Sequence, residues 1–207
     1  MTDLHQDYWA RQGLAYETTH RSFEGTERAF FRKQEHALVR FLERLKFDSV
    51  LEFGCGFGRV TSTLCDTIVP KKYNAFDLSE EQVASARKRC PGVSFTVETL
   101  QNYQPAELHD LVLGVEVLLH VPPDEIEQVL ARLASWTGKY LVHIDQWPPQ
   151  EGEAYKLMTT KSGHWSGNRC AFSYYHNYPL LHAMGLRKVE VVPIGDRQAL
   201  FCWRRSD

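Results

Sequence analysis

The chain has 207 residues, a formal net charge of -2 at pH 7 and a hydrophobic content of 43%, which fits one globular domain with an apolar core. A net charge this close to neutral gives no general attraction to nucleic acid or to an anionic membrane, and it favours a small-molecule ligand. The five cysteines form no C-x-x-C pair, so neither a disulfide framework nor a zinc site is predicted. The sequence shows no leader-like start and no run of about 18 apolar residues. We therefore expect a cytoplasmic protein that binds neither nucleic acid nor membrane and is a monomer or a homodimer.

Helical and strand periods alternate along the chain, with Gly and Pro residues between them. The polar and aromatic start, 8–23, predicts a short helix and a loop. Helices are then predicted over 26–45, 59–67, from 79 to the Pro-Gly break at 91–92, and over 123–136 and 178–184. Strands are predicted over 49–53, 72–76, 93–97, 110–115, 140–145, 188–193 and 199–203. Residues 145–172 are expected to be irregular.

This order of elements predicts an α/β fold. Strands that alternate with helices form a parallel sheet with right-handed crossovers and helices on both faces. The last two strands are separated by Gly195-Asp196, which predicts an antiparallel hairpin. We expect a Rossmann-like doubly wound sheet of seven strands, mostly parallel, with an antiparallel last strand. The single domain would comprise an N-terminal helical cap (1–46), a cofactor-binding core (47–145), a substrate cap (146–178) and a C-terminal helix and hairpin (179–207).

The first predicted strand runs into a turn with three glycines at alternate positions, Gly54, Gly56 and Gly58. Glycine adopts dihedrals that other residues avoid and lets a ligand approach the backbone, while the following helix directs its free N–H groups at the turn. The second strand ends at Asp77, 25 residues after Glu52, where a carboxylate can accept both hydroxyls of a ribose. The two features together predict a ligand that contains adenosine.

Two segments of the sequence indicate which adenosine-containing ligand the chain binds. Residues 50–58, with the sequence V-L-E-F-G-C-G-F-G, resemble the first motif of class I S-adenosylmethionine-dependent methyltransferases, in which an acid precedes G-x-G-x-G. Residues 110–121, with the sequence D-L-V-L-G-V-E-V-L-L-H-V, resemble the fourth-strand motif of that family. The resemblance implies S-adenosyl-L-methionine as the cofactor, S-adenosyl-L-homocysteine as its product, and methyl transfer to a small-molecule acceptor.

The resemblance also implies the cofactor-binding residues. The three glycines would approach the methionine and ribose, and Glu52 would steady the turn and contact the ammonium through water. Asp77 would bind the ribose diol. Leu78 would cover one face of the adenine, and the turn Glu98-Thr99-Leu100 would meet its other edge. The remaining residues expected at the cofactor are Cys55 in the glycine turn, Val115 and Glu116 near the methionine, and Tyr16, which with His20 would close this end of the site.

The chemistry of methyl transfer predicts where the substrate site lies. An in-line displacement needs an aligned acceptor and a site that excludes water, and an oxygen or nitrogen acceptor can also need a base. The aromatic segments 8–23 and 145–178 are expected to cover the strand ends. The predicted acid/base and positioning groups are His120, Asp145, His164 and His176. Oxygen is the preferred acceptor atom, followed by nitrogen and carbon.

Several alternatives remain open on the sequence. His120 can be a structural histidine of its loop, and the aromatic side chains can simply pack a small cap. His143 with Asp145, His164 and His176 matches no metal-site spacing, so no metal is predicted. A nicotinamide-dependent oxidoreductase also uses a glycine turn and an acid, although its pattern is G-x-G-x-x-G, with the third glycine one residue later than here. A protein that binds S-adenosylmethionine for regulation, without catalysis, is the third alternative.

Overall fold

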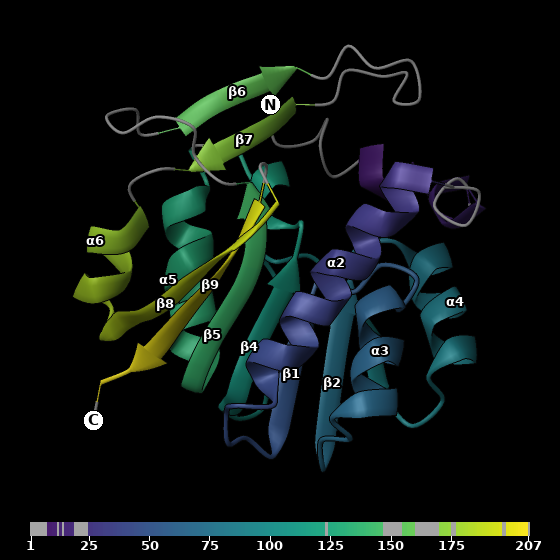
Figure 1. The fold of residues 1–207 in the computed structure, drawn as a ribbon, viewed down its shortest axis with the longest axis horizontal. Helices are drawn as coiled ribbons and strands as arrows, with labels where there is room; N and C mark the ends of the chain where they lie inside the picture. Colours follow the sequence, from purple (N-terminus) through teal and green to yellow (C-terminus); the bar gives the residue numbers. More distant parts are fainter. Residues whose placement is uncertain are drawn as a thin grey trace.

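The computed structural model describes residues 8–11, 13, 15–18, 25–122, 124–146, 155–159, 170–174, 177–195 and 198–206. Its centre is a seven-stranded sheet with the strand order β3-β2-β1-β4-β5-β9-β8 (Figure 1). The strands are β1 (Ser49–Phe53), β2 (Lys72–Asp77), β3 (Ser94–Val97), β4 (His109–Val115), β5 (Thr137–Gln146), β8 (Leu186–Ile194) and β9 (Gln198–Arg205). The first five strands pair in parallel, whereas β9 runs antiparallel to both β5 and β8. The predicted mixed sheet with an antiparallel last strand is confirmed.

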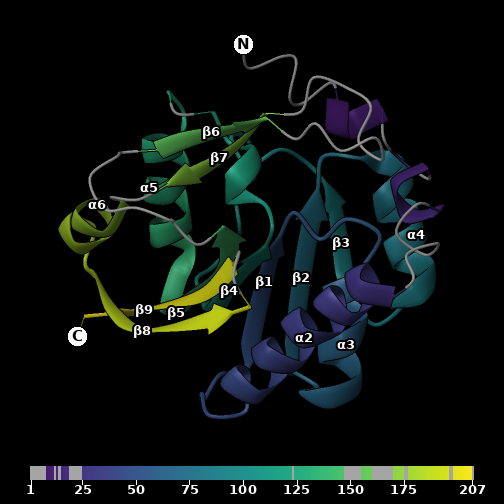
Figure 2. The ribbon, with the colours of Figure 1, turned by 45° about the horizontal axis from the view of Figure 1, so that its top comes forward.

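Helices cover both faces of this sheet, as predicted (Figure 2). One face packs against α2 (Gly25–Leu42), α3 (Arg59–Thr67) and α4 (Glu80–Arg89). The other packs against α5 (Ile126–Trp136) and α6 (Asn177–Ala183). The predicted helix over 123–136 starts only at Ile126 because a turn closed by the bond from Glu125 N–H to the Pro122 carbonyl (3.0 Å) precedes it. None of the helices in the described ranges is both long and apolar enough to cross a bilayer.

The first strand shows how the sequence divides its side chains between the two faces. Val50 joins the core beneath α2 to α4, and Leu51 and Phe53 join the core beneath α5 and α6. Glu52 shares the face of Val50 because successive side chains of a strand point to opposite sides. Full burial of each apolar side chain stabilises the fold by about 1.5–3 kcal/mol. The strand is therefore buried on both faces, and its acid lies inside the protein.

The segment predicted to be irregular contains a second sheet, so this part of the prediction was wrong. Strands β6 (Tyr155–Thr159) and β7 (Cys170–Tyr174) pair antiparallel. They lie over the carboxyl ends of the main strands, and β7 lies against η1 (Leu118–His120), a short 3₁₀ helix (Figure 1). The connection over 160–169 is too long for the two-residue turns that mark a hairpin in a sequence. The backbone hydrogen bonds of this hairpin therefore had no local sequence signal.

A substitution at Gly114 tests how tightly β4 packs against β1. A Cβ atom at Gly114 of β4 would overlap the ring of Phe53, which is fully buried. We expect Gly114→Ala to lower the free energy of unfolding by about 1–3 kcal/mol, because an overpacked core must shift side chains or backbone. Urea denaturation monitored by circular dichroism measures the change. Gly92→Ala is the matched control, since a Cβ there meets nothing within 4 Å; equal stability of the two variants would contradict the packing at Gly114.

Candidate functional site

The glycine turn after β1 has the left-handed backbone that the sequence predicted. The φ angles of Gly54, Gly56 and Gly58 are +65°, +54° and +79°, a region that is unfavourable for residues with a Cβ. A Cβ at Gly54 would also lie 2.5 Å from Val117 Cγ2. Gly58 is the N-cap of α3 and offers no side-chain cap, so the first N–H groups of that helix face the turn. The turn can therefore bring bare backbone against a ligand.

Asp77 joins the end of β2 to this turn. Its Oδ2 accepts the Gly56 N–H (2.8 Å), and its Oδ1 accepts the Ser79 N–H (2.9 Å) at the start of α4. Burial raises the pKa of Asp77, and these backbone N–H groups oppose the rise. Each carboxylate oxygen has a second lone pair, and the residue is only half-buried. Asp77 thus fixes the turn and can still accept hydroxyl groups of a ligand.

Glu52 lies beneath the turn and is only 2% exposed. Its Oε2 accepts hydrogen bonds from Thr61 Oγ1 (2.6 Å) and Tyr73 Oη (2.7 Å). Burial raises the pKa of Glu52 to about 7, while both hydroxyls and the charge of Arg59 oppose the rise. This carboxyl group therefore changes its charge near neutral pH, next to the predicted position of the cofactor.

The end of β3 lies beside Asp77. The Glu98 N–H donates to the Asp77 carbonyl (3.0 Å), and Glu98 Oε1 accepts the Thr99 N–H (2.8 Å). Glu98, Thr99 and Leu100 are all half-buried, as is Leu78. The residues expected around the adenine therefore directly follow the carboxyl ends of β2 and β3.

The end of β4 lies on the opposite side of the glycine turn. Glu116 has a φ of +58°, and its backbone N–H donates to the Ile144 carbonyl (2.8 Å). Its Oε1 accepts a hydrogen bond from Gln198 Nε2 (2.5 Å). Burial raises the pKa of Glu116, whereas Arg59 and the amides oppose it. Both Glu116 and its neighbour Val115 remain half-buried, within reach of a ligand on the turn.

Aromatic rings enclose the glycine turn from the N-terminal side. Residues 8–11, 13 and 15–18 are helical. The Trp9 ring lies 5.3 Å from that of Tyr16 and 4.6 Å from that of His120, and Tyr16 lies 6.0 Å from Phe57 in the turn. The structure thus brings Tyr16 to the turn and His120 to the same aromatic group. His20 lies outside the described residues.

A salt bridge holds this N-terminal helix on α4. Glu17 is buried and accepts hydrogen bonds from Arg89 Nη2 (3.1 Å) and from Ser85 Oγ. The Arg89 guanidinium also lies 5.1 Å from the centre of the Phe57 ring. Glu17 was not predicted as a site residue, because its partners are about 70 residues away along the chain.

Asp145 is buried and bound from two sides. Trp203 Nε1 donates to His143 Nε2 (3.3 Å), and because an indole N–H can only donate, the proton of a neutral His143 is on Nδ1. This Nδ1–H then donates to Asp145 Oδ2 (2.8 Å), while Asp145 Oδ1 accepts the Leu119 N–H of η1 (3.3 Å). The pKa of Asp145 is raised by burial, against the effect of His143. Asp145 thus links β5 to the short helix that carries His120.

The other two predicted acid/base residues, His164 and His176, lie outside the described residues. Within the described part of the chain, no three His, Cys, Asp or Glu side chains gather to hold a metal ion. Cys55, predicted at the cofactor, is buried, and burial raises the pKa of its thiol.

Sequence comparison finds a family that matches the central part of the chain. Residues 50–139 match the family described as "Methyltransferase domain". Trans-aconitate 2-methyltransferase of Rhizobium etli is 27% identical over 122 residues, which cover 59% of this chain and 47% of that protein. Malonyl-[acyl-carrier protein] O-methyltransferase 1 of Ilyobacter polytropus is 29% identical over 69 residues, which cover 32% of this chain and 26% of that protein. The chain spans about half the length, or less, of the curated relatives that it matches.

Solved structures share the fold over nearly the whole chain. Magnesium protoporphyrin IX methyltransferase from Synechocystis PCC 6803 with bound SAM superimposes with a TM-score of 0.74 at 17% identity, over 97% of this chain and 95% of that one. The 1,6-didemethyltoxoflavin-N1-methyltransferase of Burkholderia thailandensis, with bound 1,6-didemethyltoxoflavin and S-adenosylhomocysteine, gives a TM-score of 0.71 at 18% identity. The superposition covers 89% of that chain and 100% of this one. The fold is that of α/β methyltransferases.

The raised pKa of Glu52 predicts how stability changes with pH. The folded-state pKa of about 7 lies above the ordinary value of 4.5, so the folded chain keeps a proton that the unfolded chain releases in this window. The free energy of unfolding should therefore fall as the pH rises from 4.5 to about 7, by up to about 3 kcal/mol from this group. Glu52→Gln keeps an oxygen for both hydroxyls but has no proton to lose.

We expect the stability of Glu52→Gln relative to the unsubstituted chain to increase between pH 5 and pH 8. Denaturant unfolding at both pH values measures this difference, with Glu127→Gln on the exposed side of α5 as the control. A difference that is the same at both pH values would contradict the raised pKa.

Proposed function

We propose that the chain is a class I S-adenosylmethionine-dependent methyltransferase and that it methylates an oxygen atom of a small-molecule acceptor. Bound S-adenosylmethionine would supply an electrophilic methyl group and leave as S-adenosylhomocysteine. The names of similar proteins include both an O-methyltransferase and an N1-methyltransferase. Nitrogen is therefore the second choice of acceptor atom.

The residues at the carboxyl edge of the sheet fit this cofactor. Its adenosine part has a ribose diol, for which Asp77 has spare acceptor capacity, and the left-handed glycines leave space for close approach. Its α-ammonium and sulfonium groups are positively charged, and the ionised carboxylates of Glu52 and Glu116 complement them. We propose that the Glu98 turn and Leu78 surround the adenine and that Tyr16 closes the turn from outside.

The observation that carries the proposed acceptor atom is the position of His120. Its imidazole lies 4.6 Å from the Trp9 ring, and the short helix η1 that carries it follows the carboxyl end of β4 and lies against β7. An imidazole can remove a proton at neutral pH, and a hydroxyl acceptor must lose its proton as the new bond to carbon forms. We propose that His120 takes this proton, while Trp9 and the β6–β7 hairpin exclude water from the reacting oxygen.

The remaining predicted residues have supporting roles in this proposal. Asp145 would position His120, because it holds the backbone of η1 through Leu119. His164 and His176 belong to the segment proposed as the substrate cap, 146–178, where they would contact the acceptor. The segment 1–46 would form the second part of the cap, over the core at 47–145.

Transfer of labelled methyl groups tests the proposed function. The chain would be incubated with methyl-labelled S-adenosylmethionine and a metabolite extract, and mass spectrometry would identify the products. We expect label in a small molecule at an oxygen atom. Label on nitrogen or carbon would contradict the acceptor atom, and no label with tight S-adenosylhomocysteine binding would favour the regulatory alternative.

Replacement of His120 tests its role as the base. His120→Asn should lower the turnover number by about 10²-fold or more, the usual contribution of a general base, while the dissociation constant of S-adenosylhomocysteine stays within about twofold. The acceptor found in the extract is the substrate for this assay, and calorimetry gives the dissociation constant. His36→Asn on the exposed side of α2 is the matched control. Full turnover in His120→Asn would exclude the base.

A further inference from the structure

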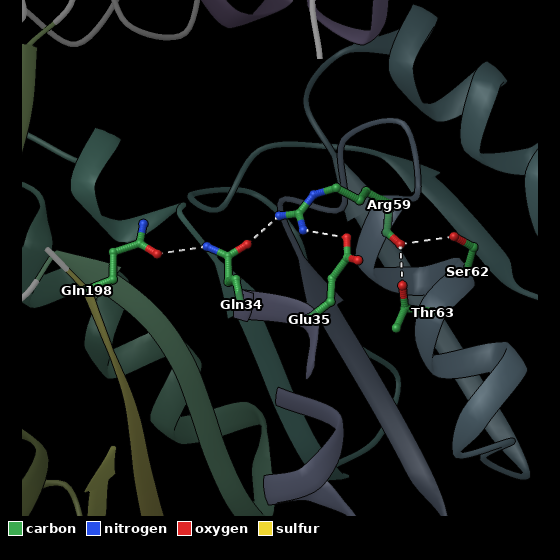
Figure 3. A network of polar contacts seen from close by, with 6 residues as sticks. All are labelled: Gln34, Glu35, Arg59, Ser62, Thr63 and Gln198. Carbon is green, nitrogen blue, oxygen red and sulfur yellow. Dashed lines mark hydrogen bonds and ion pairs between the residues drawn. The ribbon is translucent and has the colours of Figure 1, made fainter. Parts of the chain in front are cut away.

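A line of side-chain hydrogen bonds connects the start of α3 to the end of β4. Figure 3 shows its part from Arg59 to Gln198. Arg59 Nη2 donates to Gln34 Oε1 (2.7 Å), and Gln34 Nε2 donates to Gln198 Oε1 (2.9 Å). Gln198 Nε2 then donates to Glu116 Oε1 (2.5 Å). All three bonds run in the same direction, from a guanidinium to a carboxylate, through two amides that come from α2 and β9.

The chemistry of the two ends fixes both amides. A guanidinium can only donate hydrogen bonds, and a carboxylate can only accept them. If either glutamine amide exchanged the positions of its oxygen and nitrogen, two donors or two acceptors would face each other. Gln34 and Gln198 are each only 1% exposed, and water cannot replace a lost partner there at low cost. The line of bonds therefore has one arrangement when Glu116 is ionised.

Arg59 is itself held in place. Its Nη1 donates to Glu35 Oε1 (2.8 Å), and its guanidinium lies 5.0 Å from the centre of the Phe31 ring (Figure 3 shows the pair with Glu35). Both partners belong to α2, as does Gln34. Three residues of α2 thus hold the guanidinium of Arg59 in place.

Both ends of the line meet the glycine turn. Arg59 directly follows Gly58, and Val117, the neighbour of Glu116, lies against Gly54. Asp77 instead contacts Gly56 from the side of β2. Asp77 and Glu116 therefore lie on opposite sides of the glycine turn.

The backbone of Glu116 indicates that its position serves a ligand. A φ of +58° is rare for a residue with a long side chain, and such strain is common at binding sites. The strained residue directs its carboxylate into the line of amides instead of into solvent. If Asp77 binds the ribose, the amino-acid part of the same ligand would lie on the opposite side of the glycine turn, next to Glu116.

We propose that Gln34 and Gln198 are positioning residues that hold the Glu116 carboxylate for the α-ammonium group of the cofactor. The inference rests on the proposed function, since it concerns the amino-acid part of S-adenosylmethionine. Arg59 acts through the two amides and keeps Glu116 ionised and aligned. Helix α2, which lies outside the central sheet, thereby contributes to recognition of the cofactor without touching it.

Calorimetry with two probes tests this positioning role. S-adenosylhomocysteine carries the α-amino acid, whereas 5′-methylthioadenosine has the same adenosine and thioether without it. Gln34→Glu can still accept from Arg59 but cannot donate to Gln198, and Gln198→Met has a similar length without polar atoms. We expect each variant to bind S-adenosylhomocysteine about tenfold more weakly or worse, the usual effect of losing a hydrogen bond to a charged group, and to bind 5′-methylthioadenosine within about twofold of the unsubstituted chain.

The controls separate this role from a structural one. Gln128 is exposed on α5, so Gln128→Glu and Gln128→Met repeat the same chemical changes away from the site. An equal loss of affinity for both probes, or no loss for either, would overturn the inference alone. Absence of S-adenosylhomocysteine binding by the unsubstituted chain would overturn the proposed function as well.

Discussion

The hydrogen bond from Gly56 N–H to Asp77 Oδ2 joins the first two strands at the point where the site begins. It is possible only because the turn adopts left-handed angles at Gly54, Gly56 and Gly58, which place the backbone N–H toward β2. The other oxygen of Asp77 accepts the backbone N–H of Ser79, the N-cap of α4. One carboxylate therefore sets the position of the glycine turn relative to the helix next to it, and every further residue of the site is arranged around that turn.

The same edge of the sheet gathers acids that are costly to bury. Burial raises the pKa values of Glu52, Asp77, Glu116 and Asp145, which means that the fold is less stable than it would be with neutral groups there. Each acid keeps its place through specific donors, such as Thr61 and Tyr73 for Glu52. A site with this charge suits a cationic ligand, because binding then compensates the buried negative charge. Under the proposed function, these acids reduce stability and supply the negative charge that recognises the cofactor.

Much of the fold could be predicted from the sequence because its signals are local. Strand β1 was predicted with its observed bounds, and the helix predicted from 79 corresponds to α4, whose N-cap Ser79 accepts the Gln82 N–H through its Oγ. Apolar spacing and glycine placement depend only on neighbouring residues, so one sequence suffices to find them. The carboxyl edge of the parallel strands then followed from topology.

Features that depend on distant partners could not be predicted. Gln34 and Gln198 are 164 residues apart, and a single amide in a helix or a strand has no distinctive pattern. His143 was considered only as a possible metal ligand, whereas its ring lies between Trp203 and Asp145. The pairing of β6 with β7 across a long connection was missed for the same reason. Such contacts become visible only when the sheet order is known.

The glycine turn and Asp77 form the proposed binding site for S-adenosylmethionine. An NMR titration of the ¹⁵N-labelled chain with S-adenosylhomocysteine tests it most directly, with NADH as the comparison ligand. We expect the amide signals of Gly54, Gly56, Gly58 and Thr99 to shift on addition of S-adenosylhomocysteine and to stay unchanged with NADH. Shifts of these signals with NADH alone, or no shift with either ligand, would exclude this binding site.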